Sequence, residues 1–446
     1  MILQDWWFTT LLGMEAPMQP PLQGDVRTDV AIVGAGMAGL SAALRLAESD
    51  RKVTILERNV CGGSSTGKSA GFLTPDSELE LSQLVRRFGP DGARDLWAVP
   101  VKGIELITSH VRSHSIQCDL VKQDSLFVGN GREGWKEVQQ EFDARRQLGY
   151  PQTLYSAGQL PTVLGSARYA GGVRYPDTYG INALLYAQGI KRVLLTKGVQ
   201  IFESTEVRKI DGHTLHTHLG SVTADKIIVC ADKLTPSLTK YARNVFHAQT
   251  FLSISEPLED ENVKRLFPEE PLQCWDSDLV YTYWRLTGDR RLLLGGGSAL
   301  TTFALHAVTP PRVIQNVIRR FKARFPYLKP LEFIQYWPGL IDTTRDLFPT
   351  VVRDDRAPWI QYVLGCVGLP WAAFCGDFAA RHALDTDAQT DHHYYRYFAA
   401  DRPFLLPLGA ERFLGKPLVF SINNAWAKYY QVDHKNRGAP AAGQDN

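Results

Sequence analysis

The sequence predicts an α/β fold in which a Rossmann-like domain with a parallel sheet is interleaved with an α+β domain built on an antiparallel sheet. The first observation is an apolar strand, an amphipathic helix and a second apolar strand in immediate succession over residues 28–57, which is the pattern of a βαβ unit. The second is a group of later segments that alternate apolar and polar residues as antiparallel strands do; they are residues 246–254, 280–286, 291–294 and 333–337. Because the two kinds of segment are interspersed, we expect both domains to be discontinuous.

The elements follow from local patterns. In the βαβ unit, Thr28 to Val33 is β-branched and predicts a buried strand, Met37 to Glu48 carries an apolar helical face, and Lys52 to Glu57 predicts the second strand. Residues 79–173 are expected to be mainly helical, with one strand near Leu126. The remaining expectations are a helix over 182–197, strands over 199–202 and 226–231, and a helix over 313–325 that ends at Pro326.

The chain divides into segments that return to the same domain. At 446 residues it is long enough for two or three packed domains. We expect residues 24–90, 174–240 and 338–385 to form the Rossmann-like domain, and residues 91–173 and 241–337 to form the second, substrate-binding domain. Residues 386–446 form a C-terminal extension, and its last part, residues 435–446, is rich in Gly, Ala, Pro and polar residues and predicts a frayed tail.

Composition excludes several classes of protein. The 49 Lys and Arg residues against 47 Asp and Glu residues give a net charge of +2, so a general nucleic-acid binder is not expected. The six cysteines form no C-x-x-C pair, which indicates neither a disulfide framework nor a zinc cluster and favours a reducing compartment. The N-terminus lacks the features of a signal peptide, and no apolar run is long enough to cross a bilayer. We therefore expect a cytoplasmic protein with no transmembrane segment.

The strongest motif is Gly34-Ala35-Gly36-Met37-Ala38-Gly39, a G-x-G-x-x-G placed between a strand and a helix. Its glycines permit a tight turn, the approach of a pyrophosphate to the backbone, and close packing of helix on strand. Glu57 ends the following strand, where an acidic side chain binds ribose hydroxyls. Together these features predict a dinucleotide site, and the acidic residue disfavours NADP.

Other sequence motifs occur without the structural context that their usual function requires, and we interpret them as chance matches. Gly129 to Gly134 repeats the glycine spacing, but bulky Trp135 follows it and no acidic residue ends the next segment, which indicates a turn in the second domain. The run from Gly62 to Ser69 matches a P-loop, yet Gly71 and Pro75 follow where a helix should start. His110 and His114 have helical spacing without a zincin glutamate or a third ligand, so no metal site is expected.

On these residues the chain resembles the D-amino-acid oxidase superfamily of FAD-dependent enzymes, and within it the gamma-glutamylputrescine oxidase and glycine oxidase branch. Besides Gly34 to Glu57, the loop Gly67 to Gly71 resembles the family's S-G-R-N-G-G segment, and Arg285 to Gly296 resembles its R-L-T-x-D-x-R-L-L-F-G-G strand pair. The stretch from Trp337 to Pro349 and the segment Gly365 to Gly376 are similar to the family's last flavin contacts.

The resemblance implies a FAD-binding Rossmann-like domain of the glutathione-reductase type and noncovalent FAD, since no cysteine lies between Gly339 and Asp346. The ADP half would lie on the N-terminal unit, and the isoalloxazine ring would lie between the two domains. The residues implied in cofactor binding are Gly34, Gly36, Met37, Ala38, Gly39, Glu57, Arg58, Ser64, Ser65, Gly67, Lys68, Ser69, Ala70, Gly71, Val207, Gly365, Gly368, Leu369 and Pro370.

The function that this implies is oxidation of a primary or secondary amine or amino acid, with a gamma-glutamylputrescine-like substrate favoured. Hydride passes from the carbon beside nitrogen to the flavin, the imine hydrolyses, and oxygen reoxidises the flavin. Tyr283, Trp337 and Arg345 are candidates for substrate positioning, because an Arg fork suits a carboxylate. No side chain is required as a catalytic base.

Two alternatives stay open. A quinone or another acceptor could replace oxygen in a dehydrogenase at the membrane surface, with the segments 404–406 and 426–430 supplying apolar contact. The chain could also be a nonenzymatic FAD-binding partner protein.

Overall fold

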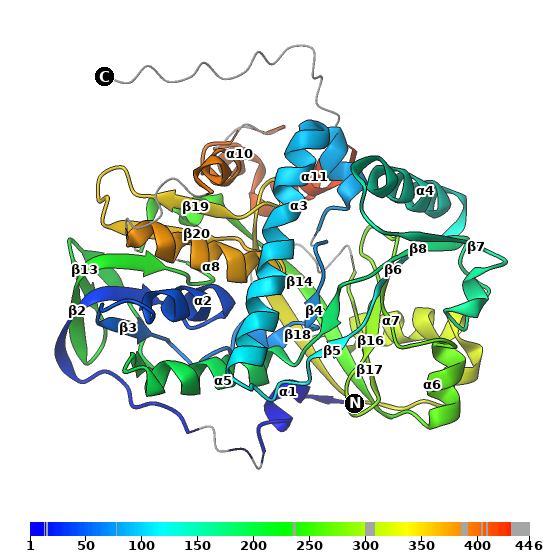
Figure 1. Cartoon of the computed structure of the whole chain (residues 1–446), viewed down its shortest axis with the longest axis horizontal. Coiled ribbons are helices and arrows are strands. Elements are labelled where there is room, and N and C mark those ends of the chain that lie inside the picture. The colour runs from blue at the N-terminus through cyan, green and yellow to red at the C-terminus, as the bar shows by residue number, and fades with distance from the viewer. Residues whose placement is uncertain are drawn as a thin grey trace.

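The computed structural model describes residues 1–12, 14, 17–76, 78–234, 238–298, 308–384, 391–402, 405–406 and 409–429. Figure 1 shows two layered parts joined by the long helix α3 (Leu81–Ser113). A largely parallel sheet with helices α2, α5 and α8 lies on one side, and a larger mixed sheet with α4, α6 and α7 lies on the other. This arrangement confirms the predicted fold class.

The first sheet has eight strands and is built on the predicted βαβ unit. Strands β2 (Gly24–Val33) and β3 (Val53–Leu56) are parallel, and α2 (Met37–Leu46) connects them. The four residues that end β2 are all buried, as a continuous apolar run requires in a sheet covered on both faces. Strands β10 (Gln200–Phe202), β13 (Gly220–Val229) and β20 (Ile360–Leu364) extend it in parallel. Antiparallel strands β11 (Lys209–Asp211), β12 (Thr214–His216) and β19 (Thr350–Arg353) complete it.

The second sheet has nine strands and is mainly antiparallel. Its order is β1 (Ile2–Leu3), β18 (Phe333–Thr344), β14 (Val245–Pro257), β17 (Arg291–Gly296), β16 (Tyr283–Leu286), β15 (Gln273–Asp276), β6 (Ser125–Val128), β8 (Gly171–Tyr175) and β7 (Thr153–Ser156). All four predicted antiparallel segments are strands of this sheet. The predicted division between domains at residues 337 and 338 falls inside β18, and the assignment of residues to domains stays a prediction.

Residues 79–173 hold more strand than the sequence predicts. Besides β6 they include β5 (Val121–Lys122), β7 and part of β8. These segments are short, and β8 begins with two glycines, so their alternation is too brief to register as a strand pattern. Gly129 and Asn130 lead from β6 into α4 (Gly131–Leu148), so the predicted turn is only two residues long and Gly131 to Gly134 lie in the first turn of the helix.

The remaining elements connect and cover the two sheets. They are α1 (Trp6–Thr9), the three-stranded sheet of β4 (Phe72–Leu73), β9 (Tyr179–Gly180) and β5, α5 (Ala183–Thr196), α6 (Asp260–Leu266), α7 (Pro311–Arg324), α8 (Leu369–Ala383), α9 (Tyr395–Phe398), α10 (Glu411–Leu414) and α11 (Lys416–Tyr429). Short 3₁₀ turns η1 to η5 lie at Thr66–Lys68, Leu160–Thr162, Lys240–Asn244, Pro326–Leu328 and His392–Tyr394. The tail at residues 435–446 lies outside the described residues. Among those that are described, no helix has both the length and the apolarity of a membrane span.

A buried ion pair fixes the edge of the parallel sheet to its neighbours. Lys191 of α5 lies 3.2 Å from Glu203, and both side chains are nearly inaccessible to solvent. Glu203 also accepts hydrogen bonds from the backbone of Gln19 and Cys61, at 2.6 Å each. One carboxylate therefore holds the lead-in to β2, the loop after β3 and helix α5.

Removing the cation of this pair should destabilise the fold. Lys191→Met leaves the carboxylate of Glu203 buried without its counter-ion, so we expect the free energy of unfolding of the apoprotein to fall by about 3–5 kcal/mol in urea denaturation. The exposed pair of Lys209 and Asp211 supplies the control, because Lys209→Met should cost less than about 1 kcal/mol. Equal losses in the two variants would contradict this role of the buried pair.

Candidate cofactor and substrate site

The turn after β2 has the geometry of a pyrophosphate cradle. Gly34 has a φ of +97°, and a Cβ there would lie 2.7 Å from the carbonyl oxygen of Cys230. A Cβ on Gly39 would lie 1.9 Å from the carbonyl oxygen of Gly34, so α2 packs directly on the turn. Helix α2 begins immediately after Gly36. Its N-terminus therefore supplies partial positive charge at this turn, where an anionic group is stabilised.

Glu57 lies at the end of β3 beside the same turn. Its two carboxylate oxygens accept hydrogen bonds from the backbone of Ala35 and Asn59, at 2.8 Å each. Burial raises the pKa of Glu57 above its ordinary value, and these two backbone donors oppose that rise. The side chain is held in one orientation at the rim of a cavity, as a ribose ligand must be.

Three cavities follow one another from Glu57 to the space between the two large sheets. The first is lined by the turn after β2, by Glu57 and Arg58, and by residues 205–208. It shares Gly36, Ser65, Thr66, Cys230 and Asp232 with the second cavity. The second shares Ser69, Ala70, Tyr283, Ile341, Val367, Gly368 and Leu369 with the third. The three cavities are therefore adjacent in a row, and we call the first two the cofactor channel and the third the acidic cavity.

The loop at Lys68 to Gly71 borders this channel, and each of its four carbonyl oxygens accepts a hydrogen bond from a separate donor. Those of Lys68 and Ser69 accept from the indole nitrogens of Trp337 and Trp7, at 3.1 and 2.8 Å. Those of Ala70 and Gly71 accept from Nε of Arg285 and the backbone nitrogen of Ile181, at 2.7 and 2.9 Å. Because peptide groups are trans, the N–H groups of Ala70 and Gly71 point away from the carbonyls of the preceding residues. The loop is thus fixed by its carbonyls, and these N–H groups are left on the opposite side.

Arg285 is buried in strand β16 of the nine-stranded sheet and donates the hydrogen bond to Ala70 of this loop. Its guanidinium also donates to the carbonyl oxygens of Ile181 and Leu286, at 2.7 and 3.1 Å. Burial lowers its pKa to about 10, so it stays charged at neutral pH. Its geometry is that of a structural donor, since five N–H groups in a fixed fork can satisfy several carbonyls at once.

Helix α8 begins on the other side of the channel. Gly368, with a φ of +93°, precedes its first residue, Leu369. Val367, Gly368 and Leu369 line both the cofactor channel and the acidic cavity. The first turn of α8 therefore directs partial positive charge at the junction of the two, where negative charge would be stabilised.

The acidic cavity is lined by carboxylates and aromatic rings. Tyr281 donates from its hydroxyl to Glu78 at 3.3 Å, and Trp275 donates from its indole nitrogen to Glu80 at 2.8 Å. The acidic residues that line it are Asp76, Glu78, Glu80, Glu137, Asp276 and Asp278, and the aromatic ones are Phe72, Phe127, Trp275, Tyr281 and Tyr283. Among the described lining residues there is no Lys, Arg or His.

Behind this cavity Asp76 and Glu80 come close to Glu141 of α4, with carboxylate oxygens within 4.8 Å of one another. Arg145 lies 3.4 Å from Asp76 and 2.8 Å from Glu141 and supplies a cation to the group. Burial raises the pKa of Asp76 to about 6 although Arg145 opposes the rise. Burial, with the charges of Asp76 and Glu141, raises the pKa of Glu80 well above its ordinary value. The arginine accounts for this group without a metal, and the expectation of no metal site stays a prediction.

Most of the residues expected to bind the cofactor line the cofactor channel or, in the case of Gly71 and Pro370, the acidic cavity alone. The exceptions are Gly39 and Gly67, whose backbones pack against Gly34 and Gly62. The run from Gly62 to Ser69 contains only the 3₁₀ turn at Thr66–Lys68, followed by β4, and not the α-helix of a P-loop. Val207 lies in the first cavity.

Of the three positioning candidates, only Tyr283 lines the channel. It lies where the cofactor channel meets the acidic cavity, and burial raises its pKa to about 12. Trp337 is buried and donates to the backbone of Lys68, so it supports the loop and does not line any of the three cavities. The structure does not bring Trp337 to the position expected for substrate contact.

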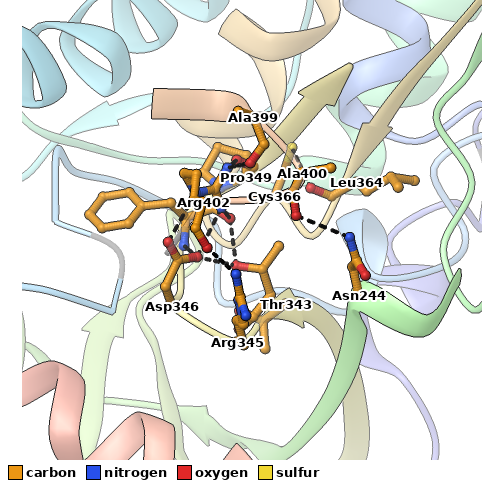
Figure 2. Close-up of polar contacts among 12 residues, drawn as sticks. Asn244, Thr343, Arg345, Asp346, Pro349, Leu364, Cys366, Ala399, Ala400 and Arg402 are labelled. Atoms are coloured by element: carbon orange, nitrogen blue, oxygen red, sulfur yellow. Dashed lines mark hydrogen bonds and ion pairs between the residues drawn. The ribbon is translucent and has the colours of Figure 1, made fainter. Parts of the chain in front are cut away.

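Arg345 also lies outside the channel, in a cluster that fastens the C-terminal segment. Figure 2 shows it beside Asp346 and Arg402. Its guanidinium donates to the backbone carbonyls of Arg402 and, at 3.2 Å, Leu406. Arg402 in turn contacts both carboxylate oxygens of Asp346, at 3.0 and 2.9 Å. Although burial opposes it, Arg402 holds the pKa of Asp346 well below its ordinary value. The donors of Arg345 are thus directed at chain segments and not at a substrate.

Some residues of the site were not predicted from the sequence. Trp7 was not singled out because α1 is a single turn, yet its indole holds Ser69. Apart from Glu137 of α4, the carboxylates of the acidic cavity come from two distant segments. A signal did exist, since Asp76, Glu78 and Glu80 alternate along one segment and Asp276 and Asp278 repeat that spacing in another. Nothing in the sequence indicates that the two segments meet.

The match of a family model to residues 29–382 identifies the class of protein. The model is described as FAD dependent oxidoreductase (DAO), and it covers most of the chain. The protein belongs to this family and is a FAD-dependent oxidoreductase. The geometry fits the cofactor, because a glycine turn, a helix N-terminus and a fixed carboxylate lie in order along one channel.

Individual relatives are similar over most of their length. The chain is 28% identical over 359 residues to the probable oxidoreductase OrdL of Haemophilus influenzae, covering 78% of this chain and 80% of that protein. It is 28% identical over 357 residues to the gamma-glutamylputrescine oxidoreductase of Escherichia coli, covering 78% and 81%. The crystal structure of glycine oxidase from Geobacillus kaustophilus matches with a TM-score of 0.73 at 19% identity, covering 85% of this chain and all of that one.

Glu57→Gln tests the ribose position. The amide removes the negative charge and turns an NH₂ group toward one of the two backbone donors. We expect the FAD dissociation constant to rise about ten-fold or more, because a charged hydrogen-bond acceptor is lost. Titration of apoprotein with FAD, followed by flavin fluorescence, measures it. Glu48→Gln, at an exposed residue just after α2, is the control, and an unchanged constant in Glu57→Gln would remove this residue from the cofactor site.

Arg345→Ala separates a structural from a substrate-binding role. Loss of two buried donor contacts should lower the free energy of unfolding by about 1–3 kcal/mol. The value of kcat/KM for the best substrate should change less than about ten-fold. Arg356→Ala, at an exposed residue in the same region, is the control. A large loss of kcat/KM at unchanged stability would instead restore Arg345 as a carboxylate ligand.

Proposed function

We propose that the protein oxidises a primary or secondary amine, with FAD as noncovalently bound oxidant. The observation that carries the proposal is the acidic cavity at the end of the cofactor channel. An extended dinucleotide with its adenosine at Glu57 would reach the junction at Tyr283 and Gly368 with its other end. A cavity rich in carboxylates at that end suits a cationic substrate.

Bound FAD would accept a hydride from the carbon beside the amine nitrogen, which leaves an imine that water hydrolyses to a carbonyl compound. The chain contributes binding, orientation and exclusion of water. Tyr283 lies at the junction and packs edge-on against Phe72, with ring centroids 5.9 Å apart. The adjacent ring of Tyr281 lies 5.5 Å from it. These rings form an apolar wall beside which a neutral amine can approach the cofactor.

A gamma-glutamylputrescine-like substrate is the favoured finer assignment. Its support is the similarity to the Escherichia coli gamma-glutamylputrescine oxidoreductase at 28% identity. Oxygen is the acceptor in this proposal.

Exposed apolar side chains on the C-terminal segment support a second candidate, in which a quinone at the membrane surface replaces oxygen. Phe413 is 90% exposed, and Leu414 and Leu418 are 45% and 49% exposed. An apolar face of this kind favours an interfacial location. Fast reoxidation of the reduced flavin by a soluble quinone analogue, with slow reoxidation by air, would favour this candidate over the oxidase.

Anaerobic absorbance spectroscopy tests the proposed activity. Purified holoenzyme is mixed with gamma-glutamylputrescine, simple amines and amino acids, and the flavin bands are followed in time. We expect at least one amine to bleach them, because a hydride donor placed at the flavin reduces it. Retention of the oxidised spectrum with every amine, while free dithionite still reduces the flavin, would overturn the proposal.

A further inference from the structure

We propose that the acidic cavity selects a substrate with two positive charges, a diamine or polyamine, and that its carboxylates bind the amine that is not oxidised. This inference rests on the proposed amine oxidation and names its substrate class. One amine gives its proton to solvent and then lies, neutral, beside Tyr283 at the junction with the cofactor channel. The other stays an ammonium ion among the carboxylates farther from that junction.

The charge of the cavity supports a cationic ligand. Six acidic residues and no Lys, Arg or His are described among the residues that line it, and the guanidinium of Arg145 behind them is shared between Asp76 and Glu141. Burial raises the pKa of Glu80 well above its ordinary value and that of Asp76 to about 6, so a ligand that stabilises their charged forms is favoured here. An ammonium ion does this, because it supplies hydrogen-bond donors together with the opposite charge.

The carboxylates are held in place before any ligand binds. Asp276 accepts hydrogen bonds from the backbone of Thr282 and Asp278, at 3.0 and 3.2 Å, which closes the turn between β15 and β16. Asp278 accepts from the side chain of Asn130 at 2.9 Å. These contacts fix the backbone and side chains of the turn in the folded protein. Binding of a cation therefore requires little further loss of conformational entropy.

Aromatic rings separate the two charged positions of the ligand. Tyr281 contacts the ring of Tyr283 and donates to Glu78, so it connects the cofactor end of the cavity to its carboxylates. Trp275 and Phe127 stack with ring centroids 6.2 Å apart beside Asp276. Methylene groups pack well on such faces, and ring faces attract ammonium ions. An alkyl chain with an amine at each end matches this order of surfaces.

The cavity has no match for a carboxylate ligand. Its described lining residues include no cation, and Arg345 binds the C-terminal segment instead. A carboxylate placed among these acidic groups would meet like charges in a partly desolvated space, which is strongly unfavourable. The same lining that attracts a second ammonium ion therefore rejects amino acids that carry a carboxylate in its place. It also favours a simple diamine over gamma-glutamylputrescine, whose glutamyl end carries a carboxylate beside its ammonium group, so on this point the inference departs from the finer assignment that sequence similarity favours.

Three compounds of equal chain length test the inference on the holoenzyme. They are putrescine with two amines, butylamine with one, and gamma-aminobutyrate with a carboxylate in place of the second amine. Anaerobic flavin reduction gives kcat/KM for each. We expect putrescine to exceed butylamine by at least about ten-fold, and gamma-aminobutyrate to be the poorest, from charge complementarity in a partly buried site.

Two amide variants locate the selective charges. Asp278→Asn and Glu78→Gln each keep an oxygen that can accept the existing hydrogen bond from Asn130 or Tyr281 while removing the charge. Each should lower the ratio of kcat/KM for putrescine to that for butylamine by about ten-fold. Asp50→Asn, at an exposed residue that lines none of the three cavities, should leave this ratio unchanged.

Calorimetric titration of oxidised holoenzyme with putrescine gives a readout that does not need turnover. If butylamine is as good a substrate as putrescine, or the ratio survives both amide variants, the inference fails while amine oxidation stands. If no amine reduces the flavin, amine oxidation fails. In that case putrescine binding that is lost in both variants supports the cation site, and absence of putrescine binding to the wild-type protein overturns it.

Discussion

The rest of the site depends on one constraint: each of four consecutive carbonyl groups, from Lys68 to Gly71, must accept a hydrogen bond. Their donors come from α1, from β18, from β16 and from the segment before α5, so parts distant in sequence converge on one loop. A buried carbonyl left without a donor lowers the stability of the fold by about 1–3 kcal/mol. The peptide groups of the loop therefore cannot rotate without the loss of several hydrogen bonds at once. Its fixed orientation determines which face borders the channel and places Tyr283 of β16 next to it.

The electrostatics of the channel change from one end to the other. At the cofactor end, the N-termini of α2 and α8 supply partial positive charge, and the side chains of Arg58, Lys68, Arg208 and Lys233 line the same two cavities. Asp232 lines this end too, but it accepts the hydroxyl of Ser65 and lies 3.9 Å from Lys233. At the far end six carboxylates gather. A pyrophosphate is therefore favoured near the N-terminus of α2, and a cation is favoured beyond Tyr283.

The sequence allowed the fold class and the adenosine end of the site to be predicted, because both depend on local signals. A strand, a glycine turn and a helix lie within thirty residues, and Glu57 follows at a distance set by the βαβ geometry. The acidic cavity could not be predicted, because Asp76 and Asp276 come from segments two hundred residues apart that only the tertiary fold brings to one cavity. Trp337 shows the same limit, since its position in β18 was predicted but the direction of its indole was set by Lys68.

Arg345 shows why a residue type at a plausible place in the sequence is weak evidence for a substrate contact. An arginine that binds a ligand carboxylate must keep its fork free, whereas this one is used by two carbonyls of the C-terminal segment, next to an Asp346 already engaged by Arg402. With that fork engaged, discrimination among amines has to come from the cavity lining. Selectivity is a difference between two binding free energies, here that of a diamine and that of an amino acid. The six acidic residues change both of them, in opposite directions. They stabilise a second ammonium ion and repel a carboxylate in its place, so the same side chains attract one substrate class and exclude the other without any residue dedicated to exclusion.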